Sequence, residues 1–280
     1  MRFKRIYIEV INTCNLSCSF CIQNQREPRI MEVTQFSNIL SQMKPYCEYI
    51  YLHVLGEPLS HPQLNELLDV ANDMGIHVNI TTNGTLLAKQ KEVLKTHTIR
   101  QINVSLHSFP QHMRAHYFED VFSVCEELAS LGVYINYRLW SIQEQGLQSE
   151  SEDILKDVLK RYNMSNEEVD IKRLQRISLQ KNISLHFEEV FAWPSLQHPF
   201  VNETGRCLGM KDMCAILSNG EVVPCCLDSK GECSLGNIYE QSFEDIITSS
   251  KAQTIVEGFF KGKIEEELCK HCSYRLRFSK

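Results

Sequence analysis

Short apolar runs rich in β-branched and aromatic residues alternate with longer segments of helical periodicity along most of the chain. This alternation predicts βαβ units and a mainly parallel sheet, which right-handed crossovers curl into an open or closed α/β barrel. We expect strands at residues 6–10, 49–54, 77–81, 100–106, 133–139 and 183–190, and helices at 34–43, 62–74, 86–95, 121–131, 152–162 and 166–180.

Three cysteines follow the first predicted strand directly, at Cys14, Cys18 and Cys21, with the spacing C-x3-C-x2-C. Thiolates this close together are spaced to bind a metal centre. A cubane iron–sulfur cluster that only carries electrons normally has a cysteine on each iron, whereas this loop leaves one iron without a nearby ligand. An open position is typical of catalytic metal sites. The loop therefore predicts a catalytic cluster, with a zinc knuckle or a disulfide pair as the alternative.

Further polar residues fall at the C-terminal ends of the next predicted strands, where the chemistry of α/β barrels gathers. They are Gly56 and Glu57 in Leu55-Gly56-Glu57-Pro58, Asn83 in Thr82-Asn83-Gly84, Ser105 and His107, and Arg138. A Gly-Glu-Pro segment taken alone is more often only a turn. For Arg138, the alternative to a functional role is an ordinary surface cation at the end of a strand.

The cysteine spacing, with Phe20 just before the third cysteine, resembles the radical S-adenosylmethionine (SAM) superfamily. The resemblance implies that a [4Fe–4S] cluster binds SAM through its open iron and that Phe20 belongs to the cofactor-binding loop. It implies that Gly56 and Glu57 hold the amino group of SAM, that Ser105 and Asn83 contact it, and that Arg138 pairs with its carboxylate. Leu55 departs from the family pattern, which has a glycine there.

Two histidines are candidate proton acceptors on the substrate side. His53 interrupts an apolar strand, and His107 stands where related enzymes often have an acidic residue. For both, the alternative is a structural histidine whose ring nitrogens are hydrogen-bonded within the protein.

A second group of cysteines lies beyond Gly205. Val222 and Val223 after Ser218-Asn219-Gly220 predict a hairpin that ends just before Cys225. The region resembles the shortened twitch form of the auxiliary-cluster (SPASM) domain, with Gly220 five residues before Cys225. The resemblance implies one auxiliary [4Fe–4S] cluster on Cys207, Cys225, Cys269 and Cys272; a zinc ribbon is the alternative. Three cysteines remain unassigned: Cys214, Cys226 and Cys233. The alternatives for each are a substitute cluster ligand, a donor of a hydrogen atom to a substrate radical, or a buried thiol. Of the three, Cys226 is our candidate catalytic residue.

The composition of the chain indicates its expected partners and cellular location. The 280 residues carry a formal charge of −6, which disfavours nucleic acid as a partner. We find no signal peptide and no apolar run long enough to span a membrane. Twelve cysteines without a secretory context favour metal ligands over disulfides. We therefore expect a cytoplasmic protein with no membrane partner.

Together these features predict an α/β protein: a partial (β/α)6 radical SAM barrel over residues 1–200 and a small twitch-type iron–sulfur domain over 201–280. The expected function is radical oxidation or modification of a small biosynthetic intermediate, with SAM and two clusters as cofactors and reduced flavodoxin or ferredoxin as electron donor. Because the motif begins at Cys14, we expect no peptide-recognition module before it. Peptide epimerisation or thioether formation is the alternative within this chemistry, and a non-catalytic iron–sulfur or zinc protein is the alternative of another class.

Overall fold

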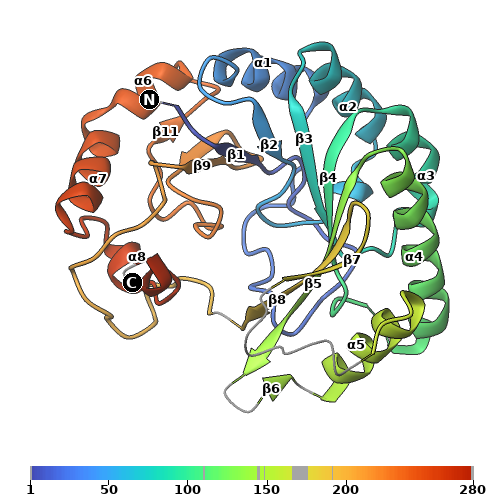
Figure 1. Cartoon of the computed structure of the whole chain (residues 1–280). Helices are drawn as coiled ribbons and strands as arrows, with labels where there is room; N and C mark the ends of the chain where they lie inside the picture. Colours follow the sequence, from blue (N-terminus) through green and yellow to red (C-terminus); the bar gives the residue numbers. More distant parts are fainter. Residues whose placement is uncertain are drawn as a thin grey trace. The chain divides into compact units, whose positions relative to one another are not determined.

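The computed structural model describes residues 2–109, 111–143, 146–147, 149–165, 176–190 and 192–278. The chain forms two compact units, residues 1–78 with 191–280, and residues 79–190. Each unit is built on strands with helices packed beside them (Figure 1). Within the described residues, no helix is long and apolar enough to cross a bilayer.

The first unit combines both ends of the chain in one mixed sheet. Its strands lie in the order β11-β10-β9-β1-β2, with β1 parallel to both β2 and β9 and with β10 antiparallel to its two neighbours. The strands are β1 (Arg5–Ile8), β2 (Tyr49–Tyr51), β9 (Met213–Ile216), β10 (Glu221–Val223) and β11 (Gly236–Asn237). The helices are α1 (Val33–Met43), α2 (Leu64–Asp73), α6 (Phe243–Thr248), α7 (Ser250–Lys261) and α8 (Glu267–Lys270), with 3₁₀ turns at Pro58–Ser60 and Tyr274–Phe278.

The second unit has the strand order β3-β4-β5-β8-β7, with β6 paired to β5. Its strands are β3 (His77–Thr82), which the boundary between the units crosses, β4 (Ile99–Ser105), β5 (Tyr134–Gln143), β6 (Gly146–Leu147), β7 (Arg176–Gln180) and β8 (Ile183–Glu189). Strands β4, β5 and β8 are parallel. The helices are α3 (Leu87–Thr96), α4 (Arg114–Ser130) and α5 (Ser149–Arg161), with a 3₁₀ turn at Gln111–Met113.

Apolar periodicity accounts for these elements. On α1, Phe36, Ile39, Leu40 and Met43 recur at helical spacing and are all buried. On β1, Ile6 and Ile8 are fully buried, as the predicted first strand requires. The α/β class and the parallel pairing predicted from the sequence are confirmed, and the mixed sheet of the described residues is not closed.

Two predicted helices differ from the structure. Helix α4 begins at Arg114, not at residue 121, because an aromatic first turn packs there: the Tyr117 ring stacks on Phe109 at 4.7 Å. The helix predicted over 166–180 is wrong for residues 176–180, which form β7, and its other residues lie outside those described. Strand β7 runs antiparallel to β8 through a turn at Asn182, which adopts a positive φ of 64°.

Candidate radical cluster and cofactor sites

The three N-terminal cysteines lie on one loop that leaves β1. Cys14 is exposed, Cys18 and Cys21 are half-buried, and none of the three forms a disulfide with another described residue. The Cys21 backbone N–H donates to the Cys18 carbonyl at 3.1 Å, and the Leu16 N–H points at the Cys14 Sγ at 3.4 Å. Phe20 is 48% exposed. Three accessible thiols on a single turn-rich loop fit a cluster with one open iron.

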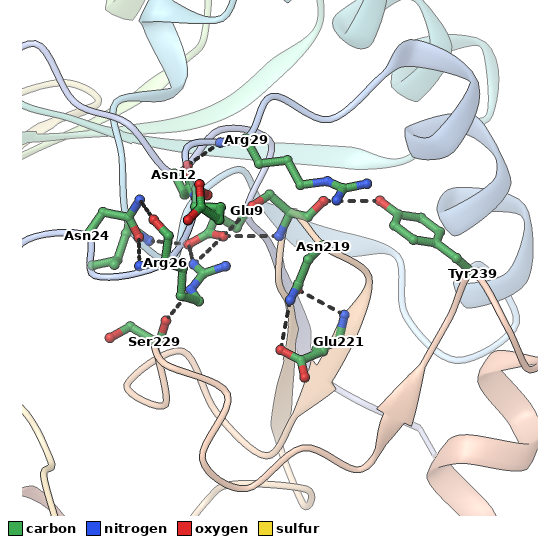
Figure 2. Close-up of polar contacts among 12 residues, drawn as sticks. Glu9, Asn12, Asn24, Arg26, Arg29, Asn219, Glu221, Ser229 and Tyr239 are labelled. Carbon is green, nitrogen blue, oxygen red and sulfur yellow. Dashed lines mark hydrogen bonds and ion pairs between the residues drawn. The ribbon is translucent and has the colours of Figure 1, made fainter.

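Asn12 closes the base of this loop. Its side-chain amide donates to the Glu27 carbonyl at 2.8 Å, and its Oδ1 accepts from the Arg29 N–H at 2.7 Å (Figure 2). The Asn12 backbone N–H also donates to the Arg29 carbonyl at 3.2 Å. Both ends of the loop are therefore fixed, while the thiols between them are not buried.

The Gly56-Glu57 segment lies against the start of the cysteine loop. The Glu57 N–H donates to the Thr13 carbonyl at 3.1 Å. Gly56 has a φ of 77°, and a Cβ built on it would lie 2.2 Å from the Ile11 carbonyl oxygen. Only glycine allows the two backbones to approach this closely. Gly56 is therefore a position of close backbone approach, and Leu55 before it stands where the family pattern has a glycine.

Glu57 is 1% exposed, and its Oε1 accepts from the Leu59 N–H at 3.0 Å, which caps the 3₁₀ turn that follows. Asn83 is also turned inward. Its Oδ1 accepts from the Thr85 N–H at 3.0 Å and the Thr85 hydroxyl at 2.7 Å. Both side chains thus stabilise the turn in which they lie.

Ser105 and Arg138 are direct neighbours across β4 and β5 in the second unit, and His186 on β8 is the next residue in the same row. The Nδ1 of His107 lies 3.3 Å from the Arg138 carbonyl oxygen. Burial lowers the pKa of His107 to about 4, and burial followed by the Arg176 and Arg138 charges lowers that of His186 to about 4. Both imidazoles are neutral near pH 7, so they act as hydrogen-bonding groups and not as cations.

His53 and Cys226 gather around the same pair of aromatic rings in the first unit. Tyr7 stacks on Tyr51 at 5.0 Å, and the His53 ring meets both edge-on, at 5.4 and 6.0 Å. Cys226 packs on the apolar cluster that contains Tyr7. The sequence analysis missed Arg5, which hydrogen-bonds Tyr51 in this group.

The predicted hairpin before Cys225 is confirmed as β9–β10. The Gly220 N–H donates to the Leu217 carbonyl at 2.9 Å, and Gly220 has a φ of 88°. A Cβ at Gly220 would lie 2.4 Å from the Asn237 Oδ1 and the Tyr239 ring. This glycine therefore lets the turn pack against the segment around β11.

Five C-terminal cysteines lie near at least one other cysteine. Cys207 interacts electrostatically with both Cys272 and Cys225, and the Cys233 thiol hydrogen-bonds Cys269. Gly209 carries the Cys207 segment past Cys225: a Cβ there would lie 3.1 Å from the Pro224 carbonyl oxygen and 3.7 Å from the Cys225 Cβ. Over the part of the chain that the structure describes, no three Cys, His, Asp or Glu side chains already stand together as a metal site.

The chemistry of this donor set fits a metal cluster. Burial raises the pKa of the Cys207, Cys225 and Cys272 thiols. Buried thiols lose their protons only when a cation compensates the charge. Cys214 and Cys47 are fully buried neighbours in the sheet region, and burial likewise raises the pKa of both.

Comparison with known proteins agrees with this arrangement. Residues 8–168 match the family model of the radical SAM superfamily, and residues 207–273 match that of an iron–sulfur cluster-binding domain, SPASM. The chain belongs to the radical SAM superfamily and carries a C-terminal SPASM domain. Its cofactors are SAM and [4Fe–4S] clusters, and radical-mediated modification is the chemistry of its class.

The individual relatives have low sequence identity to this chain. An AdoMet-dependent heme synthase from Oleidesulfovibrio alaskensis is 23% identical over 95% of this chain and 79% of its own length. A cofactor-modifying protein for tungsten-containing aldehyde ferredoxin oxidoreductase from Pyrococcus furiosus is 29% identical, but the match covers 46% of this chain and 34% of that protein. A probable GTP 3′,8-cyclase from Methanocella arvoryzae is matched over 35% of its length. The chain thus spans about a third of the length of these two relatives.

A solved structure shares the fold. The crystal structure of BtrN in complex with AdoMet and 2-DOIA aligns over 98% of this chain and 94% of its own, with a TM-score of 0.61 and 18% identity.

Proposed function

We propose that this protein is a radical SAM oxidoreductase that oxidises a small biosynthetic intermediate and passes the released electron to an auxiliary cluster. The observation that carries the proposal is the contrast between two thiol groups in one unit. The N-terminal loop offers three thiols, one exposed and two half-buried, whereas the C-terminal region offers four, three half-buried and one buried, so the two groups differ in number. A three-thiol cluster can bind SAM, and a four-thiol cluster can only exchange electrons.

When bound, the first cluster and SAM supply one-electron cleavage of the sulfonium to methionine and a 5′-deoxyadenosyl radical, which takes a hydrogen atom from a substrate C–H bond. We assign the first cluster to Cys14, Cys18 and Cys21, and the auxiliary cluster to Cys207, Cys225, Cys269 and Cys272. Loss of one further electron and one proton then oxidises the substrate by two electrons.

The other site residues bind or position SAM and substrate. Gly56 brings the Glu57 backbone to the cysteine loop, and we assign the SAM amino group to this segment. Ser105, Asn83 and Phe20 are assigned to SAM contacts, and the Arg138 guanidinium to the SAM carboxylate. Holding one C–H bond in place and excluding water is what makes such a radical selective.

On the substrate side we assign roles to His53, His107 and Cys226. Their surroundings support hydrogen bonding more than acid–base work, because the pKa of His107 is lowered to about 4 and the His53 ring meets the Tyr7 and Tyr51 rings edge-on. Cys226, packed beside the Tyr7 cluster, is the assigned hydrogen-atom donor in the epimerisation alternative, because a hydrogen atom returned to the substrate radical would leave no electron for the auxiliary cluster.

Several relatives bear on the substrate. The solved BtrN complex contains AdoMet and 2-DOIA and matches the chain almost end to end, which supports a small-molecule substrate. The alternative is a peptide: a subtilosin biosynthesis protein, AlbA of Bacillus subtilis, is 23% identical over 86% of this chain and 58% of its own length, and SuiB was solved with its precursor peptide. Either substrate needs an electron donor, for which we propose reduced flavodoxin or ferredoxin, and we place the protein in the cytoplasm.

The test is anaerobic incubation of the reduced, reconstituted protein with SAM. We expect 5′-deoxyadenosine and methionine in equal amounts and about eight irons per chain. The product should disappear in Cys18→Ala. A colourless protein that holds zinc and makes no 5′-deoxyadenosine would instead identify the non-catalytic binding protein.

A further inference from the structure

A fully buried carboxylate, Glu9, lies just beyond the end of β1 and five residues before the first cysteine. Its Oε1 and Oε2 each lie 2.6 Å from the Nη2 of Arg26, which follows the third cysteine on the same loop. Arg26 is 14% exposed and Glu9 is 0% exposed. A buried ion pair stabilises less than apolar packing of the same volume, so what it contributes is a defined geometry.

The Glu9 carboxylate also binds two other segments of the first unit. Its Oε1 accepts from the Leu55 N–H at 3.1 Å, immediately before Gly56. Its Oε2 accepts from the Ser218 N–H at 3.0 Å and the Ser218 hydroxyl at 2.9 Å, in the turn of the β9–β10 hairpin. One carboxylate therefore joins the cysteine loop, the Gly-Glu segment and the hairpin that leads to Cys225.

The guanidinium of Arg26 continues this connection. Its Nε donates to the Ser229 carbonyl at 2.8 Å, so Arg26 bridges Glu9 and the segment after Cys225 (Figure 2). Asp228 closes a turn in that segment, because its backbone N–H donates to the Cys225 carbonyl at 3.2 Å. The Asp228 carboxylate accepts from the Cys233 N–H at 2.8 Å. Arg26 thus holds a compact loop that starts at a proposed cluster ligand.

We propose that Arg26, oriented by Glu9, is a positioning residue shared by the two cluster-binding loops and holds both in their metal-binding conformations. The proposal rests on the cluster assignments above. Neither side chain ligates iron. The planar fork of arginine suits this role because separate N–H groups reach a carboxylate and a carbonyl at fixed angles.

The test measures iron retention at each cluster separately. The parent Cys225→Ala/Cys269→Ala keeps only the N-terminal cluster, and the parent Cys14→Ala/Cys18→Ala keeps only the auxiliary one. Each anaerobically reconstituted parent is challenged with a chelator, with and without further changes at Arg26. Since Arg26→Gln alone leaves Glu9 buried without its cation and can prevent folding, the main variant is Glu9→Gln/Arg26→Gln, which removes both charges.

We expect the double change to accelerate iron loss in both parents by about 10- to 100-fold, as for other residues that orient metal ligands. Arg2→Gln, which breaks the exposed pair of Arg2 with Glu48, should leave both rates unchanged. So should Leu128→Ala, which removes a fully buried side chain of the second unit and lowers stability without touching either loop.

Acceleration in only one parent, or in neither, would overturn the shared role. Equal acceleration by Leu128→Ala would also overturn it, because iron loss would then follow global stability. A parent that takes up no iron at all would contradict the cluster assignments themselves, and with them this proposal.

Discussion

Gly56→Ala is the sharpest test of how the cysteine loop and the proposed SAM site are built. The new Cβ would lie 2.2 Å from the Ile11 carbonyl oxygen and 2.9 Å from that of Thr13, both backbone atoms. An alanine at a left-handed φ costs about 1–2 kcal/mol, and overpacking against a fixed neighbour adds about 1–3 kcal/mol. Because neither carbonyl can rotate away, the Gly56-Glu57 segment must move off the loop.

Gly75→Ala is a matched control. Gly75 has a φ of 67°, close to the 77° of Gly56, but a Cβ there meets nothing within 4 Å. The control therefore carries the left-handed cost alone. If the remaining 1–3 kcal/mol appears as lost SAM affinity, the dissociation constant of SAM rises roughly 5- to 150-fold in Gly56→Ala relative to Gly75→Ala.

The assay is calorimetric titration of SAM into the reconstituted, oxidised variants, with urea unfolding of each alongside. Equal SAM affinity in the two variants would refute the close approach of the two backbones as the basis of the site. Equal urea midpoints together with equal SAM affinities would refute the steric part of the reasoning.

Three further changes have defined outcomes. Cys269→Ala should lose the auxiliary iron but keep uncoupled 5′-deoxyadenosine formation, and loss of that product as well would contradict the division of roles between clusters. Arg275→Lys should destabilise the chain by at least about 3 kcal/mol in urea, because the buried Arg275 donates to the backbone carbonyls of Cys269, Thr204 and Asn202, which lysine cannot reach together; an unchanged midpoint would exclude this clamp. The pKa of His107 is lowered to about 4, so the folded state stays neutral while the unfolded state gains a proton below its ordinary pKa of 6.5. The stabilisation from the neutral, buried His107 is fully present above pH 6.5 and falls by about 3 kcal/mol as the pH falls toward 4. His107→Gln should reduce the slope of the pH–stability curve in this range, where His186 also titrates; an unchanged slope would contradict the burial of the imidazole.

Local signals were enough for the parallel strands and the residues at their ends. Apolar runs and turn residues located β1, β4 and β5, and the cysteine loop followed β1 as predicted. The β9–β10 hairpin was also local, since an Asn-Gly pair between apolar residues determines it.

Local sequence patterns did not predict which strands far apart in the chain pair with each other. The parallel pairing of β9 with β1 joins residues 5–8 to residues 213–216, and nothing in either stretch names its partner. In the sequence, Glu9 is a single polar residue next to an apolar strand, and Arg26 is a cation in a loop. Their positioning role depends on contacts with Ser218 and Ser229, about two hundred positions away in the chain. His186 was missed because its strand aligns with Arg138 only in the folded sheet.

The central claim is that the cluster on Cys14, Cys18 and Cys21 binds SAM directly. Electron paramagnetic resonance of the dithionite-reduced Cys225→Ala/Cys269→Ala protein, recorded with and without SAM, tests this most directly. We predict a reduced [4Fe–4S] signal whose g values shift when SAM is added. A signal that SAM leaves unchanged, with the cluster fully assembled, would contradict the account.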